Sequence, residues 1–125
     1  MSTSDGLRIS YTDLVMRVEA ALVAQGFSGV VAKPIARTVA ACERDGTFSH
    51  GLLRLPGYIE AVRSGWASGA ALPTLLSRSP SLCVVDAHNG FTHLALEQHR
   101  SALKEMAAVT GVGILLIRHA HHFAA

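Results

Sequence analysis

The spacing of the apolar residues changes near residue 70, and this change constrains the fold more than any other feature of the sequence. Before it, apolar residues recur at the three- and four-residue spacing of one helix face. After it come short aliphatic runs, which are typical of strands. The sequence therefore predicts a mixed α/β fold, with a helical part over 1–70 and an α/β part over 71–125. A chain of 125 residues is long enough for one domain with a single hydrophobic core.

Three helices are expected in the first part, at 11–25, at 29–44 and in a shorter segment from near Ser49 to Gly65. Ser10 and Ser28 precede the first two helices, and their hydroxyls can accept hydrogen bonds from the free N–H groups of a first turn. Pro56 falls inside the third segment, where its ring would clash with the preceding turn. We therefore expect the third helix to be kinked or restarted at Pro56.

The second part is expected to contain strands over 74–78, 82–87 and 112–118, with a helix over 92–109 between the last two. The last run is aliphatic almost throughout, which is typical of a strand buried on both faces. The predicted order is thus three N-terminal helices followed by strand, strand, helix and strand. Gly111 and Gly113 precede a strand instead of joining a strand to a helix, so they do not form a dinucleotide-binding fingerprint.

Charge and hydropathy exclude several classes of protein. The formal net charge is +2 and the basic residues are scattered, whereas a nucleic-acid-binding protein needs a basic stripe with stacking aromatics. The longest strongly apolar run, 112–117, is too short to cross a bilayer, and 1–10 lacks the regions of a signal peptide. We therefore expect a cytoplasmic protein that binds neither nucleic acid nor membrane. Half of the residues are apolar, which suggests that another subunit or further chain covers part of the surface.

The two cysteines, Cys42 and Cys83, lack the spacing of a metal site. Disulfides are rare in the reducing cytosol. We therefore expect two buried free thiols.

The segment Ser49-His50-Gly51-Leu52-Leu53-Arg54 contains the best candidates for a reactive site. If Ser49 caps a short helix, His50 and Arg54 lie four residues apart on one face of it. A guanidinium can bind a carboxylate through two parallel hydrogen bonds, and an imidazole can give or take a proton near neutral pH. Gly51 would let a ligand approach the backbone closely. The same spacing is also compatible with an exposed histidine and a surface arginine at a helix start.

Three histidines, His119, His121 and His122, crowd the end of the last predicted strand, where α/β proteins often place ligand sites. Alternation along the strand would put His119 and His121 on one side and His122 on the other, so that two of them could share a metal ion. No Cys, Asp or Glu lies nearby in the sequence to complete a ligand set, and we expect no metal. His88, His93 and His99 are expected to be ordinary histidines of exposed helix faces.

Three segments together resemble the type 2 malate/L-lactate dehydrogenase family, which includes ureidoglycolate and sulfolactate dehydrogenases, 2,3-diketogulonate reductase and piperideine-2-carboxylate reductase. The segments are 45–58, which contains the pattern Ser-His-Gly-x-x-Arg-x-Pro, then 86–90, and 111–123. Their order and separation are similar to the N-terminal region of that family over nearly the whole chain.

The resemblance implies a homodimeric reductase with a non-Rossmann fold. Such an enzyme transfers hydride between NADH or NADPH and a small 2-oxo acid such as that of malate or lactate, or a cyclic imine acid. The resemblance places the catalytic histidine at His50, with Ser49 beside it, and the arginine that binds the substrate carboxylate at Arg54. A second active-site histidine, which also contacts the cofactor, maps to His122. Family members are much longer than this chain, so their main cofactor-binding part lies beyond residue 125, and Ala124 stands where many have glycine.

Two other interpretations remain open. The apolar composition is compatible with a non-catalytic fragment or interaction module that folds only with a partner. The terminal histidines are compatible with a metal-binding protein. Cofactor titration and metal analysis separate these interpretations.

Overall fold

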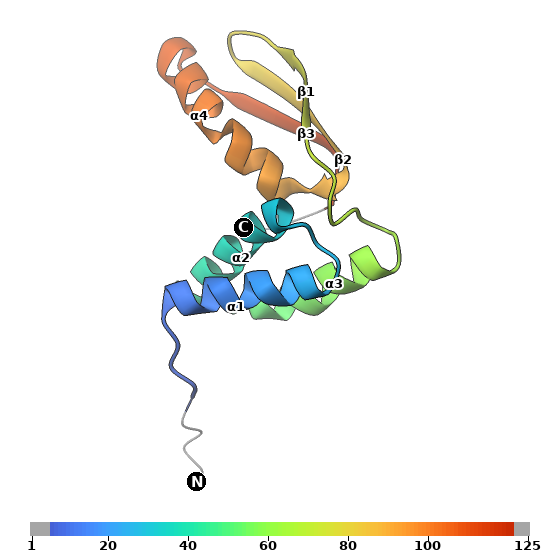
Figure 1. Cartoon of the computed structure of the whole chain (residues 1–125). Coiled ribbons are helices and arrows are strands. Elements are labelled where there is room, and N and C mark those ends of the chain that lie inside the picture. The colour runs from blue at the N-terminus through green and yellow to red at the C-terminus, as the bar shows by residue number, and fades with distance from the viewer. Residues whose placement is uncertain (1–5, 122–125) are drawn as a thin grey trace.

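The computed structural model describes residues 6–121 as two layers, a helical layer and a sheet covered by one helix (Figure 1). The helical layer contains α1 (Tyr11–Ala24), α2 (Gly29–Arg44) and α3 (Leu55–Arg63). The second layer contains β1 (Thr74–Arg78), β2 (Leu82–Phe91), α4 (Thr92–Thr110) and β3 (Ile114–His121). This order confirms the predicted α/β class, with three helices followed by strand, strand, helix and strand.

The first two helices begin where their local chemistry predicts. Ser10 Oγ accepts a hydrogen bond from the Asp13 N–H at 3.1 Å, and Ser28 Oγ accepts one from the Val31 N–H at 3.4 Å. Both hydroxyls thereby satisfy N–H groups that have no partner inside the helix. Pro34 lies in the second turn of α2, and the helix continues through it to Arg44.

The third helical segment differs from the prediction. Two short 3₁₀ turns, η1 (Phe48–His50) and η2 (Leu52–Arg54), come first, and α3 begins only at Leu55. Pro56 stands in the first turn of α3. There the fixed φ of proline favours the helix, and the N–H that proline lacks would have no partner inside the helix. The helix is therefore restarted at the proline, which is one of the two expected outcomes, and the segment before it is a loop of two turns.

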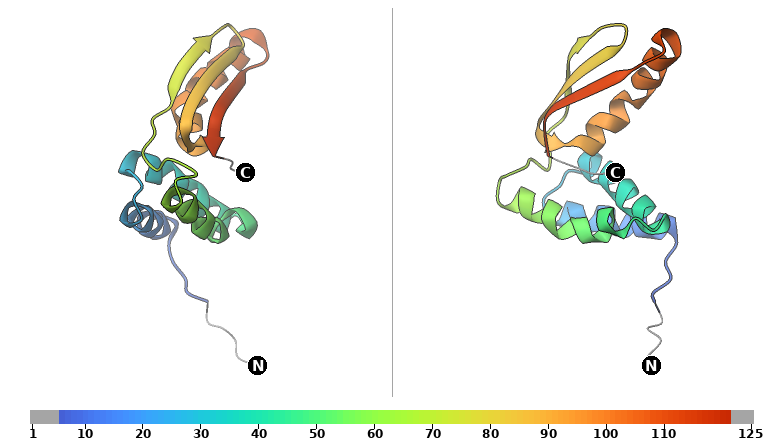
Figure 2. Two further views of the ribbon diagram at one scale, coloured as in Figure 1. Left: turned by 90° about the vertical axis from the view of Figure 1, so that its right-hand side faces the viewer. Right: turned by 180° about the vertical axis from the view of Figure 1, so that it is seen from behind.

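The sheet has the order β1-β2-β3, with β1 antiparallel and β3 parallel to β2. Helix α4 makes the crossover between the parallel strands and covers one face of the sheet (Figure 2). Both β2 and β3 extend beyond their predicted ends, and their register shifts between Asp86 and Gly90. His88, Asn89 and His119 have positive φ in this region. The sequence pattern does not show the extension because left-handed backbone interrupts the alternation of side chains.

Buried apolar side chains form two clusters instead of the single core expected. The larger cluster packs α1, α2 and α3 together around residues such as Leu22. The smaller cluster lies between the sheet and α4 and includes Val85. Helix α4 belongs to both, because Leu94 is buried in the larger cluster and Ala95 in the smaller one. The fold thus has two packed halves that share one helix.

The aliphatic run of β3 predicted a strand buried on both faces, but in the described sheet only one face of β3 is covered. Leu115 and Ile117 pack against the cluster under α4, whereas Ile114 and Leu116 are 51% and 52% exposed. In residues 6–121, β3 is also an edge strand. An aliphatic run shows that both faces of a strand are apolar, and it does not show that both are covered.

Both cysteines are free thiols, as expected. Cys83 is buried, but Cys42 is only half-buried. Burial, followed by the negative charges of Asp45 and Glu43, raises the pKa of Cys42. As for helices, none within 6–121 combines the length and the apolar character that crossing a membrane requires.

Candidate active site

The loop between α2 and α3 carries the candidates Ser49, His50 and Arg54. His50 ends η1 and Arg54 ends η2, with Gly51 between the two turns. Ser49 lies inside η1 and does not cap it. The expectation of a helix capped by Ser49, with His50 and Arg54 on one face, is therefore wrong. The cause is the backbone of Gly51, whose ψ of −131° leaves the helical region and separates the two turns.

Backbone hydrogen bonds fix the main chain of this loop. The Thr47 N–H donates to the Cys42 carbonyl at 2.8 Å, which closes the loop onto the end of α2. The His50 N–H donates to the Thr47 carbonyl and the Arg54 N–H to the Gly51 carbonyl, both at 3.0 Å. The His50 side chain is half-buried, and Ser49 and Arg54 are exposed. The loop therefore presents its polar side chains at the surface on a hydrogen-bonded backbone.

Ser49 Oγ lies 3.0 Å from His50 Nδ1, so a hydrogen bond joins the two side chains. The hydroxyl can donate to a neutral Nδ1 or accept from a protonated one, and the bond can persist in both charge states of the ring. Within residues 6–121, Nε2 of His50 has no hydrogen-bond partner. An imidazole oriented through one nitrogen and open at the other is suited to transfer a proton. The expected contact is present, and the catalytic roles of both residues stay a prediction.

Arg54 forms no ion pair with any described residue between 6 and 121. Nearby arginines do: Arg44 pairs with Asp45, and Arg63 pairs with Glu60. An exposed guanidinium without a carboxylate of its own is available to bind one from a ligand. The predicted substrate-binding role of Arg54 is compatible with this placement.

Tyr58, which was not among the candidates predicted from the sequence, connects this loop with the end of β3. It is buried in α3, four residues after Arg54. Burial raises the pKa of its hydroxyl, and the positive charge of Arg54 acts in the opposite direction, so the guanidinium is within electrostatic reach of the phenol. The ring meets Phe91 and His121 edge-on, at centroid distances of 5.6 and 6.0 Å. The four-residue spacing from Arg54 was the available signal.

Asp86 of β2, which was also not among the predicted candidates, contacts several polar groups at the end of the sheet. Its Oδ1 accepts from the His88 N–H at 2.8 Å, and its Oδ2 lies 3.0 Å from His119 Nδ1. The His88 hydrogen bond, with a smaller contribution from His119, outweighs partial desolvation and holds the pKa of Asp86 below its usual value. Asp86 pairs in register with Arg118. Such pairing across the sheet cannot be found by searching for neighbours along the sequence.

The histidines at the end of β3 do not alternate as expected. His119 has a φ of 50° and contacts Asp86, whereas the His121 ring packs on Phe91 with their centroids 5.0 Å apart. His122, the predicted second active-site and cofactor-binding histidine, lies outside the described residues. Between residues 6 and 121, no three His, Cys, Asp or Glu side chains are grouped so as to hold a metal ion. The metal-binding interpretation has no support from that part of the chain.

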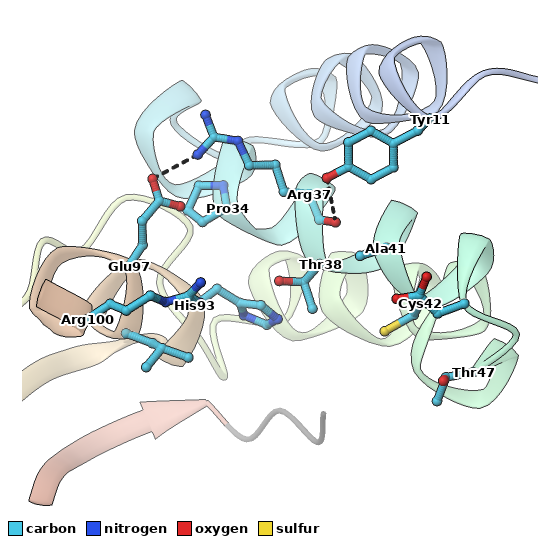
Figure 3. A pocket seen from close by; sticks show the side chains of 12 residues that line it. Tyr11, Pro34, Arg37, Thr38, Ala41, Cys42, Thr47, His93, Glu97 and Arg100 are labelled. Atoms are coloured by element: carbon cyan, nitrogen blue, oxygen red, sulfur yellow. Dashed lines mark hydrogen bonds and ion pairs between the residues drawn. The ribbon is translucent and has the colours of Figure 1, made fainter. Parts of the chain in front are cut away.

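His93 is buried, with 4% exposure, where an exposed helix position was expected. It lines a pocket of about 520 Å³ at the junction of α2 and α4 (Figure 3). Arg37 and Glu97 join the two helices beside it through a 2.9 Å ion pair. Burial, and then the charge of His121, lowers the pKa of His93 to about 4. His93 is thus neutral near pH 7, and its face of α4 is buried because that helix packs on the helical layer.

A second pocket, of about 560 Å³, lies at the end of β3. Its walls are formed by Gly65, Trp66, Asn89, His119, Ala120 and His121. Asn89 Nδ2 donates to the Trp66 carbonyl at 2.8 Å, which ties the chain after α3 to the end of β2. Trp66 is 73% exposed. Aromatic walls with a few polar groups are suited to a planar ring that forms hydrogen bonds.

The known sequences that are similar to this chain are named as dehydrogenases or reductases. The sequence profile of malate/L-lactate dehydrogenase matches residues 9–125. The chain is 42% identical over 117 residues to the Delta(1)-pyrroline-2-carboxylate/Delta(1)-piperideine-2-carboxylate reductase of Pseudomonas syringae pv. tomato, covering 94% of this chain and 34% of that protein. It is 40% identical over 119 residues to the Delta(1)-pyrroline-2-carboxylate reductase of Ancylobacter novellus, covering 95% and 35%. The chain spans about a third of the length of the curated relatives it matches.

Solved structures agree with the sequence relatives. The crystal structure of delta1-piperideine-2-carboxylate reductase from Pseudomonas syringae matches with a TM-score of 0.90 and 41% identity, over 95% of this chain and 36% of that one. Sulfolactate dehydrogenase from Methanocaldococcus jannaschii matches with a TM-score of 0.81 at 24% identity, over 94% and 34%, which is a likeness of fold alone. Both matches extend over the helical layer and the sheet. The chain therefore belongs to the malate/L-lactate dehydrogenase family, as its three sequence segments had indicated.

Proposed function

We propose that this chain supplies the proton-donating and carboxylate-binding groups of an NAD(P)H-dependent reductase of cyclic imine acids. The observation that carries the proposal is the hydrogen-bonded pair Ser49–His50, followed one turn later by Arg54, which has no ion pair in the described chain. Relatives at 42% and 40% identity are named as reductases of pyrroline-2-carboxylate, and one of them also of piperideine-2-carboxylate. These names favour cyclic imine acids over the oxo acids of malate or lactate.

A cyclic imine acid presents a carboxylate next to a C=N bond, and the candidate residues match both groups. Arg54 would hold the carboxylate through parallel hydrogen bonds, which fixes the orientation of the ring. His50 would donate its Nε2 proton to the ring nitrogen as a hydride reaches the adjacent carbon, so that C=N becomes CH–NH. Ser49, bonded to Nδ1, would keep the Nε2–H directed at the substrate. His50 must therefore be protonated for reduction and neutral for the reverse reaction.

The pocket at the end of β3 fits part of a nicotinamide cofactor. Trp66, Asn89 and the imidazoles of His119 and His121 offer flat surfaces and hydrogen-bonding groups to a ring that carries a carboxamide. Bound NADH or NADPH would supply the hydride. Residues 6–121 contain no glycine-rich loop that joins a strand to a helix and could hold the pyrophosphate. The described residues would thus provide one part of the cofactor site, and His122, the expected cofactor contact, is next in the sequence.

The test is a chimera in which residues 9–125, the span that the family profile matches, replace the corresponding segment of the Pseudomonas syringae reductase, which is 42% identical to this chain over 117 residues. The purified chimera is assayed for oxidation of NADPH and NADH with the two cyclic imine acids, and with pyruvate and oxaloacetate. The unmodified reductase is the positive control. We expect reduction of the imine acids and much slower reduction of the two oxo acids.

The outcomes of this experiment are distinct. A chimera that is folded by circular dichroism but reduces neither imine acid overturns the proposal. Activity on pyruvate or oxaloacetate alone would assign the chain to lactate or malate chemistry instead. The homodimer and the cytoplasmic location expected from the sequence stay predictions, and light scattering of the same chimera would test the first.

A further inference from the structure

We propose that Glu43 is a positioning residue for the loop that carries His50 and Arg54, and that Gly51 is the residue that makes room for it. The Glu43 carboxylate reaches from the last turn of α2 to the point where the two turns of the loop meet. This proposal rests on the proposed function, because it assigns a role in the same site. It concerns residues to which that function assigns no chemical step, and they act through the backbone that carries His50 and Arg54.

The contact is a hydrogen bond from the Leu52 N–H to Glu43 Oε1, at 2.7 Å. Leu52 is the first residue of η2 and lies between His50 and Arg54. A charged acceptor makes such a bond shorter and stronger than one between neutral groups. Since Glu43 forms no ion pair in the described chain, its carboxylate is not drawn away from the loop by a competing cation. One side chain therefore fixes the backbone midway between the two candidate residues.

Gly51 shows that the approach of Glu43 is close. A Cβ atom placed on Gly51 would overlap Oε1 and Cδ of the Glu43 carboxylate. The φ of Gly51 is −94°, so the position does not need glycine for a left-handed backbone. Glycine at this position leaves the space that the Glu43 carboxylate occupies. Gly51 and Glu43 thus form a matched pair, in which the missing side chain of one admits the carboxylate of the other.

Apart from the backbone hydrogen bonds described above, the loop has few apolar contacts to hold it. Phe48, Leu52 and Leu53 are all exposed, so the loop buries little apolar surface against the helices. A segment with few buried contacts depends on individual hydrogen bonds for its geometry. Because Arg54 and His50 must meet one small molecule together, a displacement of η2 relative to η1 would misalign the carboxylate and the imine nitrogen.

The contact itself can be tested in the 125-residue chain by amide hydrogen exchange. In Glu43→Ala the Leu52 amide should exchange faster by about tenfold or more, since a local opening no longer has to break this bond. Glu43→Gln keeps an acceptor oxygen and should retain most of the protection. Glu60→Ala, which removes an exposed glutamate of α3, is the matched control and should leave the Leu52 amide unchanged.

The positioning role is tested by kinetics in the chimera described above. Glu43→Ala should lower kcat/KM for the imine acid by about 10- to 100-fold, the scale of effects that small misplacements produce, and Glu43→Gln should restore most of it. Gly51→Ala should have a similar effect, because its methyl group displaces the carboxylate. In the double variant the two losses should not multiply, since both remove one contact. A merely structural role would lower the melting temperature and leave kcat/KM unchanged well below it.

Each outcome of these experiments either supports or overturns a stated part of the proposal. An unchanged Leu52 amide in Glu43→Ala overturns the contact and the proposal. Faster exchange with unchanged kcat/KM in an active chimera overturns the positioning role alone, and so do losses from Glu43→Ala and Gly51→Ala that multiply. An inactive parent chimera overturns the proposed function, and with it this proposal.

Discussion

Asp86 on β2 and His119 on β3 are joined by a 3.0 Å contact between Oδ2 and Nδ1, so one carboxylate ties together the ends of two parallel strands. The same carboxylate accepts from the His88 N–H, in the left-handed segment where the strand register shifts. Both contacts are strongest with an ionised acceptor. The geometry at the end of the sheet, beside the second pocket, therefore depends on the negative charge of Asp86.

Asp86→Asn should flatten the acid dependence of stability. The pKa of Asp86 is lowered in the folded chain, chiefly by the His88 N–H and also by His119. Its stabilising effect is therefore complete above the unfolded pKa of about 4 and is lost as the pH falls through the lower folded pKa. Urea unfolding between about pH 5 and pH 3 should show a steeper loss in the parent than in the variant, with Asp13→Asn as a control. If the unfolding free energy falls equally steeply with pH in the parent and in Asp86→Asn, Asp86 is not the source of this acid dependence.

His93→Leu should remove a different pH dependence, at higher pH. The pKa of His93 is lowered from 6.5 to about 4, mainly by burial. Between these values the unfolded chain binds the proton and the folded chain does not, so stability falls as the pH is lowered across this window. The parent should lose up to about 3 kcal/mol of unfolding free energy relative to the variant. The measurement is urea unfolding of both chains at pH values from 7 to 4, and parallel curves would show that His93 ionises freely.

Arg54→Met in the chimera should raise KM for the imine acid and lower kcat. Loss of a charged two-point contact typically removes about 2–3 kcal/mol, which corresponds to about a hundredfold in kcat/KM. Arg63→Met is the matched control, because Arg63 is another exposed arginine, on α3, and is paired with Glu60. A change of less than about threefold for Arg54→Met, well below the value of such a contact, would remove Arg54 from the site.

His50→Asn in the chimera should lower turnover by about 10²–10⁴-fold and leave cofactor binding largely intact, because it removes the proton donor and keeps a polar side chain. In the parent, reduction requires the protonated imidazole and oxidation of the cyclic amino acid requires the neutral one, so the two directions should depend on pH in opposite senses. The variant should lose this pH dependence. If it keeps near-normal turnover and the parent's profile, His50 is not the acid and His122 becomes the next candidate.

The elements that local chemistry defines were predictable from sequence. Ser10 and Ser28 act on N–H groups three residues away, so the starts of α1 and α2 could be placed without knowing the rest of the fold. The restart of α3 at Pro56 follows from proline geometry in the same way. Ser49, His50 and Arg54 could be named as site candidates from a short sequence pattern, because such a pattern does not depend on the exact backbone conformation.

The rest depends on contacts between residues distant in sequence. The separation of η1 from η2 follows from Gly51 and its close approach to Glu43, and neither shows in a helical pattern. The contact of Asp86 with His119 spans 33 positions of the chain and requires the strand register. The burial of His93 requires the packing of α4 on the helical layer, so an isolated histidine in a helical segment was assigned to the surface.

Leu94 and Ala95 are neighbours in α4 and are buried in different clusters. Loss of packing in either half would therefore remove the tertiary contacts on one side of this 19-residue helix. A helix of this kind depends on such contacts for its stability. We expect the two halves to unfold in a single cooperative transition, without a stable helical intermediate. A ligand bound only at the end of β3 should then slow amide exchange by global unfolding in α2 as well, although it touches no residue of that helix.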